Sequence, residues 1–356
     1  MNARASRLLE QLRAEDIRAA LVTKEENIRY FTGYTGEGCL LILPEKLVVL
    51  TDFRYVEQVS RQAPECECVR TRAGVTPEGA VATLLQEAGL QRLAYEPYQM
   101  TVAEFQGWQA ALPGVELVSL ANKPEVLRQI KDEGELDSIC RSAKIACDAF
   151  EKLLGYIRPG MTEKDIATEL DYYMFKLGSE ANAFSTIAAA GPNGSLPHAV
   201  PSDRPIQKGE LLTLDFGAKV NGYCSDMTRT VAIGPISDEL RAIYDAVLEA
   251  QLRALACVKP GASCKAVDAV ARDYLEPLYP GAFGHSLGHG VGLFIHESPG
   301  FSTRSEATLE PGHVVTVEPG VYIPGLGGCR IEDMVLVTRD GYIDPVTAPK
   351  HLIQID

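Results

Sequence analysis

The feature that most constrains this chain is a set of acidic residues inside apolar, strand-like segments of its C-terminal half. Three segments read LTLDFGAKVNGYCSDMTRTV, TVEPGVY and GCRIEDMVLV, and a glycine-rich segment, SLGHGVGLFIHE, lies among them. Their candidate metal ligands are Asp215, Asp226, His289, Glu318 and Glu332. So much negative charge cannot gather in one interior unless cations neutralise it. If the segments converge, the sequence predicts a site for two divalent cations that activates a water for hydrolysis.

The first acidic pair can be placed by hairpin geometry. Asn221-Gly222 lies between two runs of β-branched and apolar residues, which is the strongest short-range signal for a two-residue hairpin turn. With that turn, Asp226 lies opposite Gly217, two residues beyond Asp215 and on the same face. The two carboxylates are then diagonal neighbours, roughly 7–8 Å apart at the backbone. Two aspartates beside a turn are also typical of solvated hairpin charges, so this pair alone does not establish a site.

The second acidic pair repeats this pattern. Residues 313–323 and 329–338 have strand-like sequences and are joined by a glycine-rich loop. Closing the hairpin at the ends of this loop places Glu332 opposite Gly320, on the face of Glu318. Because a loop of this length often carries a bulge, other registers stay open.

The histidine segment completes the candidate ligand set. His285 and His289 have the i, i+4 spacing of a helical zinc motif, but Ser286 replaces the glutamate of HExxH. Four glycines among residues 284–292 argue against a helix and favour a strand or loop whose backbone approaches a ligand closely. With His296 nearby, the segment fits either a histidine-lined pocket or structural histidines.

In order and spacing these segments resemble metallopeptidase family M24, the pita-bread enzymes that include aminopeptidase P, prolidase and methionine aminopeptidase. The resemblance spans residues 130–356, with no departure at a ligand position, and its matching pieces lie at residues 191–193, 197–198, 215–217, 225–230, 288–292, 318–320 and 330–333. It implies a dinuclear site in which Asp215 and Asp226 chelate or bridge the cations. His289 would bind one cation, and Glu318 and Glu332 would complete the two shells. Carboxylate-rich ligation with one imidazole suits Mn²⁺, with Co²⁺, Fe²⁺ or Zn²⁺ as alternatives.

The resemblance also implies catalytic roles for residues around the cations. Glu318 would shuttle protons while it binds metal, because the matching glutamate of the family contacts the attacking water, a metal-bridging hydroxide. His198 and His296 would orient the substrate and stabilise the tetrahedral intermediate or the leaving group.

Three further residues are expected to contact the substrate. His285 would shape the pocket on the proline side. Arg330 would bind a substrate carboxylate or support Glu332, with an exposed strand arginine as the alternative. Tyr322 would donate a hydrogen bond, with a packed core tyrosine as the alternative.

The N-terminal third carries a second resemblance. Residues 26–33 (ENIRYFTG) and 51–55 (TDFRY) are similar to the creatinase-type N-terminal domain of prolidases and aminopeptidases P. We therefore expect an α+β chain, with a small α/β creatinase-like domain over residues 1–122 and a pita-bread catalytic domain over residues 123–356.

Together the two resemblances imply an Xaa-Pro peptidase that cleaves between an N-terminal residue and a following proline, either as an aminopeptidase P or as an Xaa-Pro dipeptidase. The family also implies a homodimer. The alternatives are a methionine-type aminopeptidase, another M24 aminopeptidase, a non-proteolytic creatinase-like enzyme or binding scaffold, and a two-metal phosphoesterase.

Hydrophobic patterning predicts the main elements. In the first domain we expect helices at 4–15 and 76–89 and strands at 19–23, 39–43, 47–51 and 92–95. Beyond a linker at 121–124 we expect a long helix at 132–157, and then a helix that Thr162 caps. Two helix–Pro-Gly–helix segments, around Pro159-Gly160 and Pro260-Gly261, repeat one pattern.

Charge and cysteine content disfavour several classes of protein. The formal net charge of −14 argues against binding to nucleic acid or to an acidic membrane. Nine cysteines, an odd number without a CxxC pair, do not form a disulfide framework, so we expect a reducing cytoplasm. We expect no signal peptide, because charged residues interrupt the N-terminal segment, and no membrane span, because no run approaches about 20 apolar residues.

Overall fold

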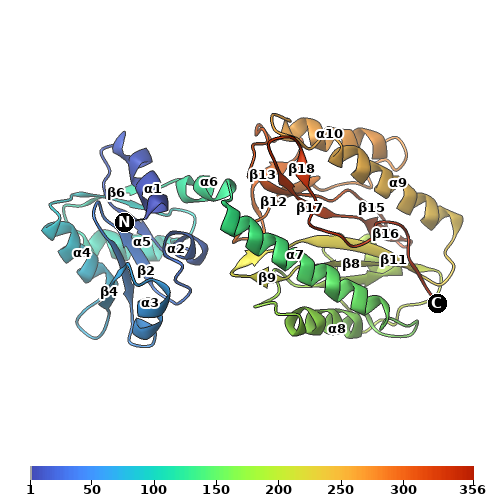
Figure 1. Ribbon diagram of the computed structural model, residues 1–356, viewed down its shortest axis with the longest axis horizontal. Helices are drawn as coiled ribbons and strands as arrows, with labels where there is room; N and C mark the ends of the chain where they lie inside the picture. The colour runs from blue at the N-terminus through green and yellow to red at the C-terminus, as the bar shows by residue number, and fades with distance from the viewer. Residues whose placement is uncertain (1) are drawn as a thin grey trace. The chain divides into compact units, whose positions relative to one another are not determined.

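A computed structural model describes residues 2–356 of the chain (Figure 1). The chain separates into two compact units, Met1–Arg128 and Gln129–Asp356. The sequence places the boundary slightly earlier, at residue 122. The difference lies in one short helix at the junction.

That helix, α6 (Lys123–Gln129), packs on the first unit. The hydroxyl of Tyr30 donates to the carbonyl of Leu127 at 3.1 Å, and the guanidinium of Arg128 donates to Asn27 Oδ1 at 2.6 Å. Both bonds join α6 to α2, so the residues expected to open the second domain close the first.

The first unit is a six-stranded mixed sheet with helices around it (Figure 1). The strand order is β4-β3-β2-β1-β5-β6, in which β2 runs antiparallel to both of its neighbours. The strands are β1 (Ala20–Val22), β2 (Cys39–Ile42), β3 (Leu47–Thr51), β4 (Glu67–Arg70), β5 (Arg92–Tyr95) and β6 (Glu116–Ser119). The other helices are α1 (Ala3–Arg13), α2 (Glu25–Thr32), α3 (Val56–Gln62), α4 (Pro77–Glu87) and α5 (Val102–Ala111).

The apolar runs of the sequence form the centre of this sheet. The strands expected at 19–23, 39–43, 47–51 and 92–95 are β1, β2, β3 and β5. The two edge strands, β4 and β6, are not predicted, because their sequences ECVR and ELVS are half polar and only partly buried.

The second unit contains two larger sheets and two short ribbons. One sheet has the order β19-β11-β8-β7 and the other has the order β13-β12-β14-β17-β18; the ribbons are β9-β10 and β15-β16. The first sheet consists of β7 (Ile187–Ala190), β8 (Glu210–Phe216), β11 (Met227–Ile233) and β19 (Gln354–Ile355). The second consists of β12 (Gly288–Gly290), β13 (Glu297–Phe301), β14 (Val314–Val317), β17 (Asp333–Val337) and β18 (Tyr342–Ile343). The ribbons are β9 (Lys219–Val220) with β10 (Tyr223–Cys224), and β15 (Gly320–Ile323) with β16 (Gly327–Arg330).

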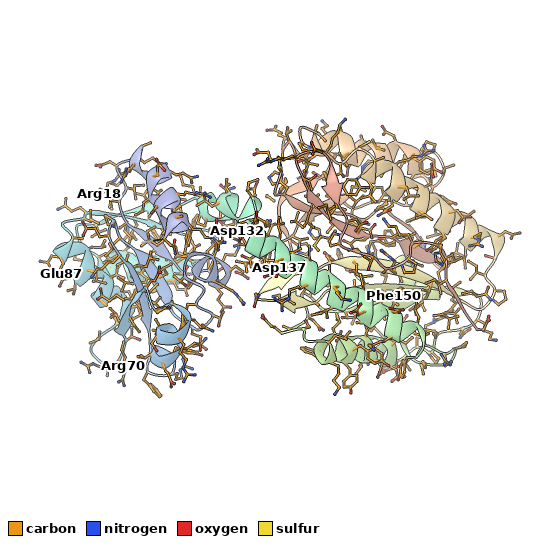
Figure 2. The ribbon with its side chains drawn as sticks, in the orientation of Figure 1. Arg18, Arg70, Glu87, Asp132, Asp137 and Phe150 are labelled. Carbon is orange, nitrogen blue, oxygen red and sulfur yellow. The ribbon has the colours of Figure 1, made fainter. Side chains whose placement is uncertain are left out.

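Two helix pairs cover these strands on opposite sides (Figure 1). They are α7 (Glu133–Leu154) with α8 (Glu163–Lys176), and α9 (Asp238–Leu255) with α10 (Cys264–Leu275). Helix α7 carries apolar residues along one stripe, and Phe150 on that stripe (Figure 2) stacks on Phe216 of β8 with ring centroids 6.2 Å apart. The helices thereby fix the strands that hold the acidic residues.

The two helix pairs repeat one local pattern, as the sequence indicates. A glycine with positive φ ends each connection, Gly160 at +92° and Gly261 at +80°. A hydroxyl residue then caps the following helix: Thr162 accepts from the amide of Asp165, and Ser263 accepts from the amide of Ala266. A long hairpin follows each pair along the chain, and these hairpins carry the acidic residues.

None of the helices over residues 2–356 combines the length and the apolar sequence needed to cross a membrane. All nine cysteines of the chain are free thiols.

Candidate metal centre

The first hairpin has the register that Asn221-Gly222 predicts. Both turn residues have positive φ, +49° and +75°, as the primed turns of two-residue hairpins require. Thr228 pairs with Asp215, and the same register places Asp226 across from Gly217. A Cβ on Gly217 would lie 1.9 Å from the carbonyl oxygen of Ser225, so only glycine fits where the hairpin bends. Asp226 lies in this bend, directly before β11.

The second hairpin has a different register from the expected one. Gly320 pairs with Arg330 and not with Glu332, and the turn is residues 324–326. The expected register is therefore wrong by two residues. The reason is that Gly327 and Gly328, which the sequence assigns to the loop, pair as strand β16.

The even size of this shift keeps the acidic residues on one face. Val317 pairs with Asp333 on one side and Gly320 with Arg330 on the other, which places Glu318 across from Glu332. The second acidic pair is therefore closer than the diagonal pair expected from the sequence. Glu332 also joins the first hairpin, because its amide donates to the carbonyl of Thr228 at 3.1 Å.

His289 lies in strand β12, which pairs with β13 and β14. Gly288, the residue before it, allows close strand packing, since a Cβ there would lie 2.0 Å from the carbonyl oxygen of Thr316, and it also lines the cavity described below. His289 Nδ1 lies 3.0 Å from the carbonyl oxygen of Gly290 and therefore carries the proton. Nε2 is then a lone-pair donor, and it lies 3.4 Å from Asp226 Oδ2 and 3.4 Å from Glu318 Oε1.

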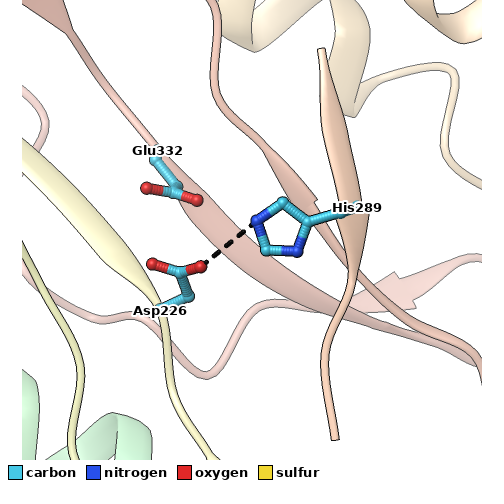
Figure 3. A group of neighbouring side chains, drawn as sticks. All are labelled: Asp226, His289 and Glu332. Atoms are coloured by element: carbon cyan, nitrogen blue, oxygen red, sulfur yellow. Dashed lines mark ion pairs between the residues drawn. The ribbon is translucent and has the colours of Figure 1, made fainter. Parts of the chain in front are cut away.

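The ligand atoms of Asp226, His289 and Glu332 all lie within 4.8 Å of one another (Figure 3). They belong to a cavity of about 640 Å³. Of the expected site residues, those lining it are His198, Asp215, Asp226, His285, His289, His296, Glu318, Arg330 and Glu332. The structure therefore brings together segments separated by more than a hundred residues.

The donor set fits divalent cations. Asp215 Oδ1 and Glu332 Oε1 are buried and accept no hydrogen bond. Burial raises the pKa of Asp226, and the neighbouring carboxylates raise it further. Burial and the same repulsion raise the pKa of Glu332, and burial raises the pKa of Glu318 to about 8. Bound cations would replace the protons that these groups otherwise retain, which is how a buried carboxylate cluster becomes stable in its charged form.

Arg330 is buried in the site, so the alternative of an exposed strand arginine is wrong. Its Nη2 donates to Asp215 Oδ2 at 2.6 Å, and its Nε donates to the hydroxyl of Thr228 at 3.1 Å. Its Nη1 donates to the hydroxyl of Tyr322 at 2.8 Å and to the carbonyl of Pro197 at 3.2 Å. The guanidinium thereby fixes the orientation of one candidate ligand.

Tyr322 lies behind the cavity and links Arg330 to His285. Its hydroxyl is 2.9 Å from His285 Nε2, and His285 Nδ1 lies 2.8 Å from the carbonyl oxygen of Ser286. Nδ1 therefore carries the proton, and the hydroxyl of Tyr322 donates to Nε2. Burial lowers the pKa of His285 to about 4, so this imidazole is neutral. Tyr322 supplies the hydrogen bond that the sequence suggests, but to a histidine of the cavity wall.

The remaining two histidines line the cavity beside the candidate ligands. The ring of His296 lies edge-on to that of His289, with centroids 4.5 Å apart. Burial lowers the pKa of His296, which favours its neutral form. His198 belongs to the segment that follows the short 3-10 helix η1 (Gly191–Ser195).

Several polar residues that support the site are not found from the sequence. Glu163 is fully buried, and its carboxylate accepts from the amide of Ala190 at 2.8 Å, from Asn193 Nδ2 at 2.7 Å and from the hydroxyl of Ser202 at 2.6 Å. These bonds hold both ends of the segment that contains His198. In the sequence Glu163 is only the first residue after a helix cap, and no local signal distinguishes it.

Comparisons with known proteins match both units. The model of metallopeptidase family M24 matches residues 137–339, and the model of the creatinase/prolidase N-terminal domain matches residues 4–130. An uncharacterised peptidase, YqhT of Bacillus subtilis, is 44% identical over 94% of this chain and 94% of its own.

Solved structures show the same relationship. The Xaa-Pro dipeptidase from Bacillus anthracis superposes with a TM-score of 0.95 at 42% identity, over 99% of both chains. The prolidase from Pyrococcus horikoshii superposes with a TM-score of 0.93 at 32% identity, over 99% of this chain and 100% of that one. These matches confirm the expected fold class, a small α/β N-terminal domain followed by a pita-bread catalytic domain.

Proposed function

Because the chain belongs to metallopeptidase family M24, with a creatinase/prolidase N-terminal domain, we propose that it is a dinuclear metal-dependent Xaa-Pro peptidase. It hydrolyses the peptide bond between an N-terminal residue and a following proline. The names of its relatives support this reaction, since the Bacillus anthracis and Pyrococcus structures are of an Xaa-Pro dipeptidase and a prolidase.

The observation that carries the proposal is a cluster of acidic side chains in which two buried carboxylate oxygens, Asp215 Oδ1 and Glu332 Oε1, accept no hydrogen bond. Asp226, His289 and Glu332 direct their ligand atoms at one point, and Asp215 and Glu318 line the same cavity. A cluster of this kind is stable in its charged form only with cations, and its oxygen-rich donor set suits Mn²⁺, with Co²⁺, Fe²⁺ or Zn²⁺ as alternatives. Two bound cations would supply a water acidified enough to attack at neutral pH, and they would polarise the scissile carbonyl.

The side chains around the cluster perform the remaining steps of hydrolysis. Glu318 lines the cavity beside the candidate ligands, and it would accept the proton of the attacking water and pass it to the leaving nitrogen, the role that the family resemblance implies. His198 and His296, at the cavity wall, orient the scissile bond and donate hydrogen bonds to the tetrahedral intermediate.

His285 forms the wall on the proline side, and Tyr322 supports it from behind the cavity. Their hydrogen bond keeps the imidazole neutral and fixed in one orientation, so a proline ring meets an uncharged surface. Arg330 donates one hydrogen bond, from Nη2, to Asp215 Oδ2 at 2.6 Å, and we propose that it positions this ligand. Its contact with a substrate carboxylate stays a prediction.

Peptide specificity tests the proposal directly. With Mn²⁺ supplied, we expect hydrolysis of Ala-Pro or Gly-Pro, or of Ala-Pro-Xaa peptides, and none of Met-Ala-Xaa or of a nitrophenyl phosphate. Cleavage of Ala-Pro alone would define a dipeptidase, and cleavage of the longer peptides an aminopeptidase P. Cleavage of only the methionyl peptide would contradict the proposed specificity.

Two further properties of the enzyme stay predictions. The family resemblance implies a homodimer, which light scattering on a size-exclusion column would measure. The free thiols are compatible with the reducing cytoplasm expected from the sequence. Alkylation of the free thiols in intact cells, without added reductant, would measure their redox state.

A further inference from the structure

A buried ion pair lies next to the loop that carries His296. Lys131 Nζ lies 3.2 Å from Glu297 Oε2, and the two side chains are 1% and 6% exposed. Neither residue lines the cavity of the metal centre. Because burying two charges is costly, the presence of such a pair is weak evidence for a purely stabilising role.

The Glu297 carboxylate shapes the loop between β12 and β13. Its Oε1 accepts from the amide of Phe294 at 3.1 Å, within the loop. The same carboxylate packs against Gly292, where an added Cβ would lie 2.6 Å from Oε2. Gly292 is itself fixed from outside the loop, since its carbonyl accepts from the amide of Cys224 at 2.9 Å. The carboxylate therefore closes the loop across its base, directly beside His296.

Lys131 is in turn fixed by the second unit. It precedes α7, whose first turn is capped by Asp132 (Figure 2), and its amide donates to the carbonyl of Gly312 at 3.0 Å. This backbone bond and the helix cap fix the main chain, and the ammonium itself is restricted because the side chain is buried. Without the ammonium, the Glu297 carboxylate would be buried without this compensating charge, and it would take up a proton or turn towards water. In either case the hydrogen bond that the Glu297 carboxylate accepts from the amide of Phe294 would be weakened or lost.

We propose that Lys131 is a positioning residue: its ammonium fixes the Glu297 carboxylate, which fixes the loop that presents His296 to the metal centre. This inference rests on the proposed function, in which His296 contacts the substrate. Lys131 contributes to the reaction through His296 and touches no substrate itself.

The first test is Lys131→Met, which removes the charge but keeps the length of the side chain. We expect kcat for the cleaved Xaa-Pro peptide to fall by up to about 100-fold, as for a small misplacement of a catalytic group, while KM and bound Mn²⁺ stay near the wild-type values. Lys144→Met is the matched control, since Lys144 lies on α7 and makes an exposed pair with Asp148. It should leave kcat unchanged. A wild-type kcat in Lys131→Met would overturn the proposal.

The second test asks whether Lys131 acts through His296. If Lys131 acts only through His296, Lys131→Met should have almost no effect once His296 has been replaced by alanine. In a His296→Ala background we therefore expect kcat/KM to fall by no more than about twofold, which is the uncertainty of such a comparison. The full loss seen in the wild-type background would show that Lys131 acts elsewhere and would overturn the proposal.

A third measurement does not depend on activity, and so separates this inference from the proposed function. Hydrogen exchange of the Mn²⁺-loaded protein should be faster over residues 291–297 in Lys131→Met and unchanged over α8. If Lys131→Met does not fold, Glu297→Gln replaces it, because the amide can still accept from Phe294 but has no charge for Lys131. Unaltered exchange in the loop of a folded variant would overturn the positioning role. A wild-type protein that cleaves no Xaa-Pro peptide would instead overturn the proposed function, with the loop measurement still standing.

Discussion

The two hairpins of the metal centre hold their acidic residues in different ways. In the first, Asp215 lies within β8 and receives a charged hydrogen bond from Arg330 at 2.6 Å. In the second, Glu318 and Glu332 lie outside the strands and each accepts from a threonine hydroxyl: Glu318 from Thr316 at 3.1 Å, and Glu332 from Thr228 at 2.7 Å. The first hairpin thus has a protein cation beside its carboxylate, and the second has only neutral donors.

The difference shows which carboxylates of the site have a charged hydrogen-bond donor and which do not. The supporting groups also cross between the hairpins, because Arg330 belongs to the second hairpin and serves Asp215 of the first. Thr228 belongs to the first hairpin and serves Glu332 of the second. Neither hairpin can present its carboxylates correctly alone, and a single guanidinium does not balance the cluster. The second hairpin should therefore depend most on bound cations, and each prediction below tests this contrast.

The largest effect is expected for Glu332→Ala. This change removes a ligand whose carboxylate accepts a side-chain hydrogen bond from a neutral hydroxyl and not from a protein cation, so we expect hydrolysis to fall to the detection limit and one bound metal to be lost. Asp226→Ala should act in the same way. Peptide assays and metal analysis of the purified variants measure both outcomes. Near-normal turnover with full metal occupancy would contradict the assignment.

Removing the protein cation should cost both stability and activity. In the metal-free protein Arg330→Met leaves the largely buried Asp215 carboxylate without its charged donor, and we expect the free energy of unfolding to fall by about 3–5 kcal/mol. Turnover should fall by about 10- to 100-fold. Urea unfolding and kcat/KM measure the two effects. Arg330→Lys is the control: it keeps the positive charge but loses the planar guanidinium with its several donors, so stability should recover more than activity does. Equal recovery of stability and activity would show that the guanidinium geometry is not needed.

The metal-free protein should lose stability as pH rises. Burial raises the pKa of Glu318 from 4.5 to about 8, so between these values the folded state binds more protons than the unfolded state does. The free energy of unfolding then decreases with pH by at most about 1.4 kcal/mol per unit for this group. Urea unfolding of the metal-free protein from pH 5 to pH 8 measures this slope. With saturating Mn²⁺ the decrease should disappear, and a metal-free protein that gains stability over this range would contradict the prediction.

The threonines should tune metal affinity. Thr228→Val and Thr316→Val keep the side-chain shape and remove the hydroxyl that orients each glutamate. We expect each to weaken Mn²⁺ binding by about tenfold. Thr228→Val should have the stronger effect, because its hydroxyl also accepts from the charged guanidinium of Arg330, whereas that of Thr316 also accepts from the neutral amide of His289. Calorimetric titration with Mn²⁺ measures the affinities. Unchanged affinity in both variants would show that the cations alone orient these carboxylates.

The same contrast explains what the sequence can predict. The register of the first hairpin follows from Asn221-Gly222, because few residue pairs adopt positive φ twice in succession and the pair therefore fixes the turn. In the second hairpin, Gly327 and Gly328 have the composition of a loop. They join the strand because another segment packs on them: a Cβ on Gly328 would lie 2.1 Å from the carbonyl oxygen of Gly194. No local pattern contains a contact of that kind.

The supporting residues show the same limit. The acidic candidate ligands can be selected because a carboxylate next to or within an apolar, strand-like segment is conspicuous in sequence. Lys131, Glu163 and Thr228 occur in ordinary polar surroundings, and their partners lie far along the chain, as Glu297 does from Lys131. A hydrogen-bonded support becomes visible only once the fold has brought its two partners together.

The smallest effects are expected for substitutions in the turns of the two hairpins. There the cost of backbone strain can be measured separately from any effect on the metal centre. Asn221 has a φ of +49° and Gly325 a φ of +81°, with open space around Gly325. Asn221→Ala and Gly325→Ala should each reduce the free energy of unfolding by about 1 kcal/mol, the cost of a side chain in the left-handed region. Asn221→Ala should cost slightly more, because it also removes a hydrogen bond to the hydroxyl of Ser138 at 3.2 Å. Asn221→Gly is the control, since it removes that bond without backbone strain.

Turnover of the same variants tests whether the turn alone sets the register of each hairpin. Since their registers are also held by strand pairs beyond the turns, kcat/KM should stay within about twofold of wild type in both alanine variants. Urea unfolding and peptide assays on the same preparations measure both effects. A large loss of turnover in Gly325→Ala alone would mean that its three-residue turn, and not the packing of Gly328 on Gly194, sets the position of Glu332. The contrast between a locally and a distantly determined register would then be wrong.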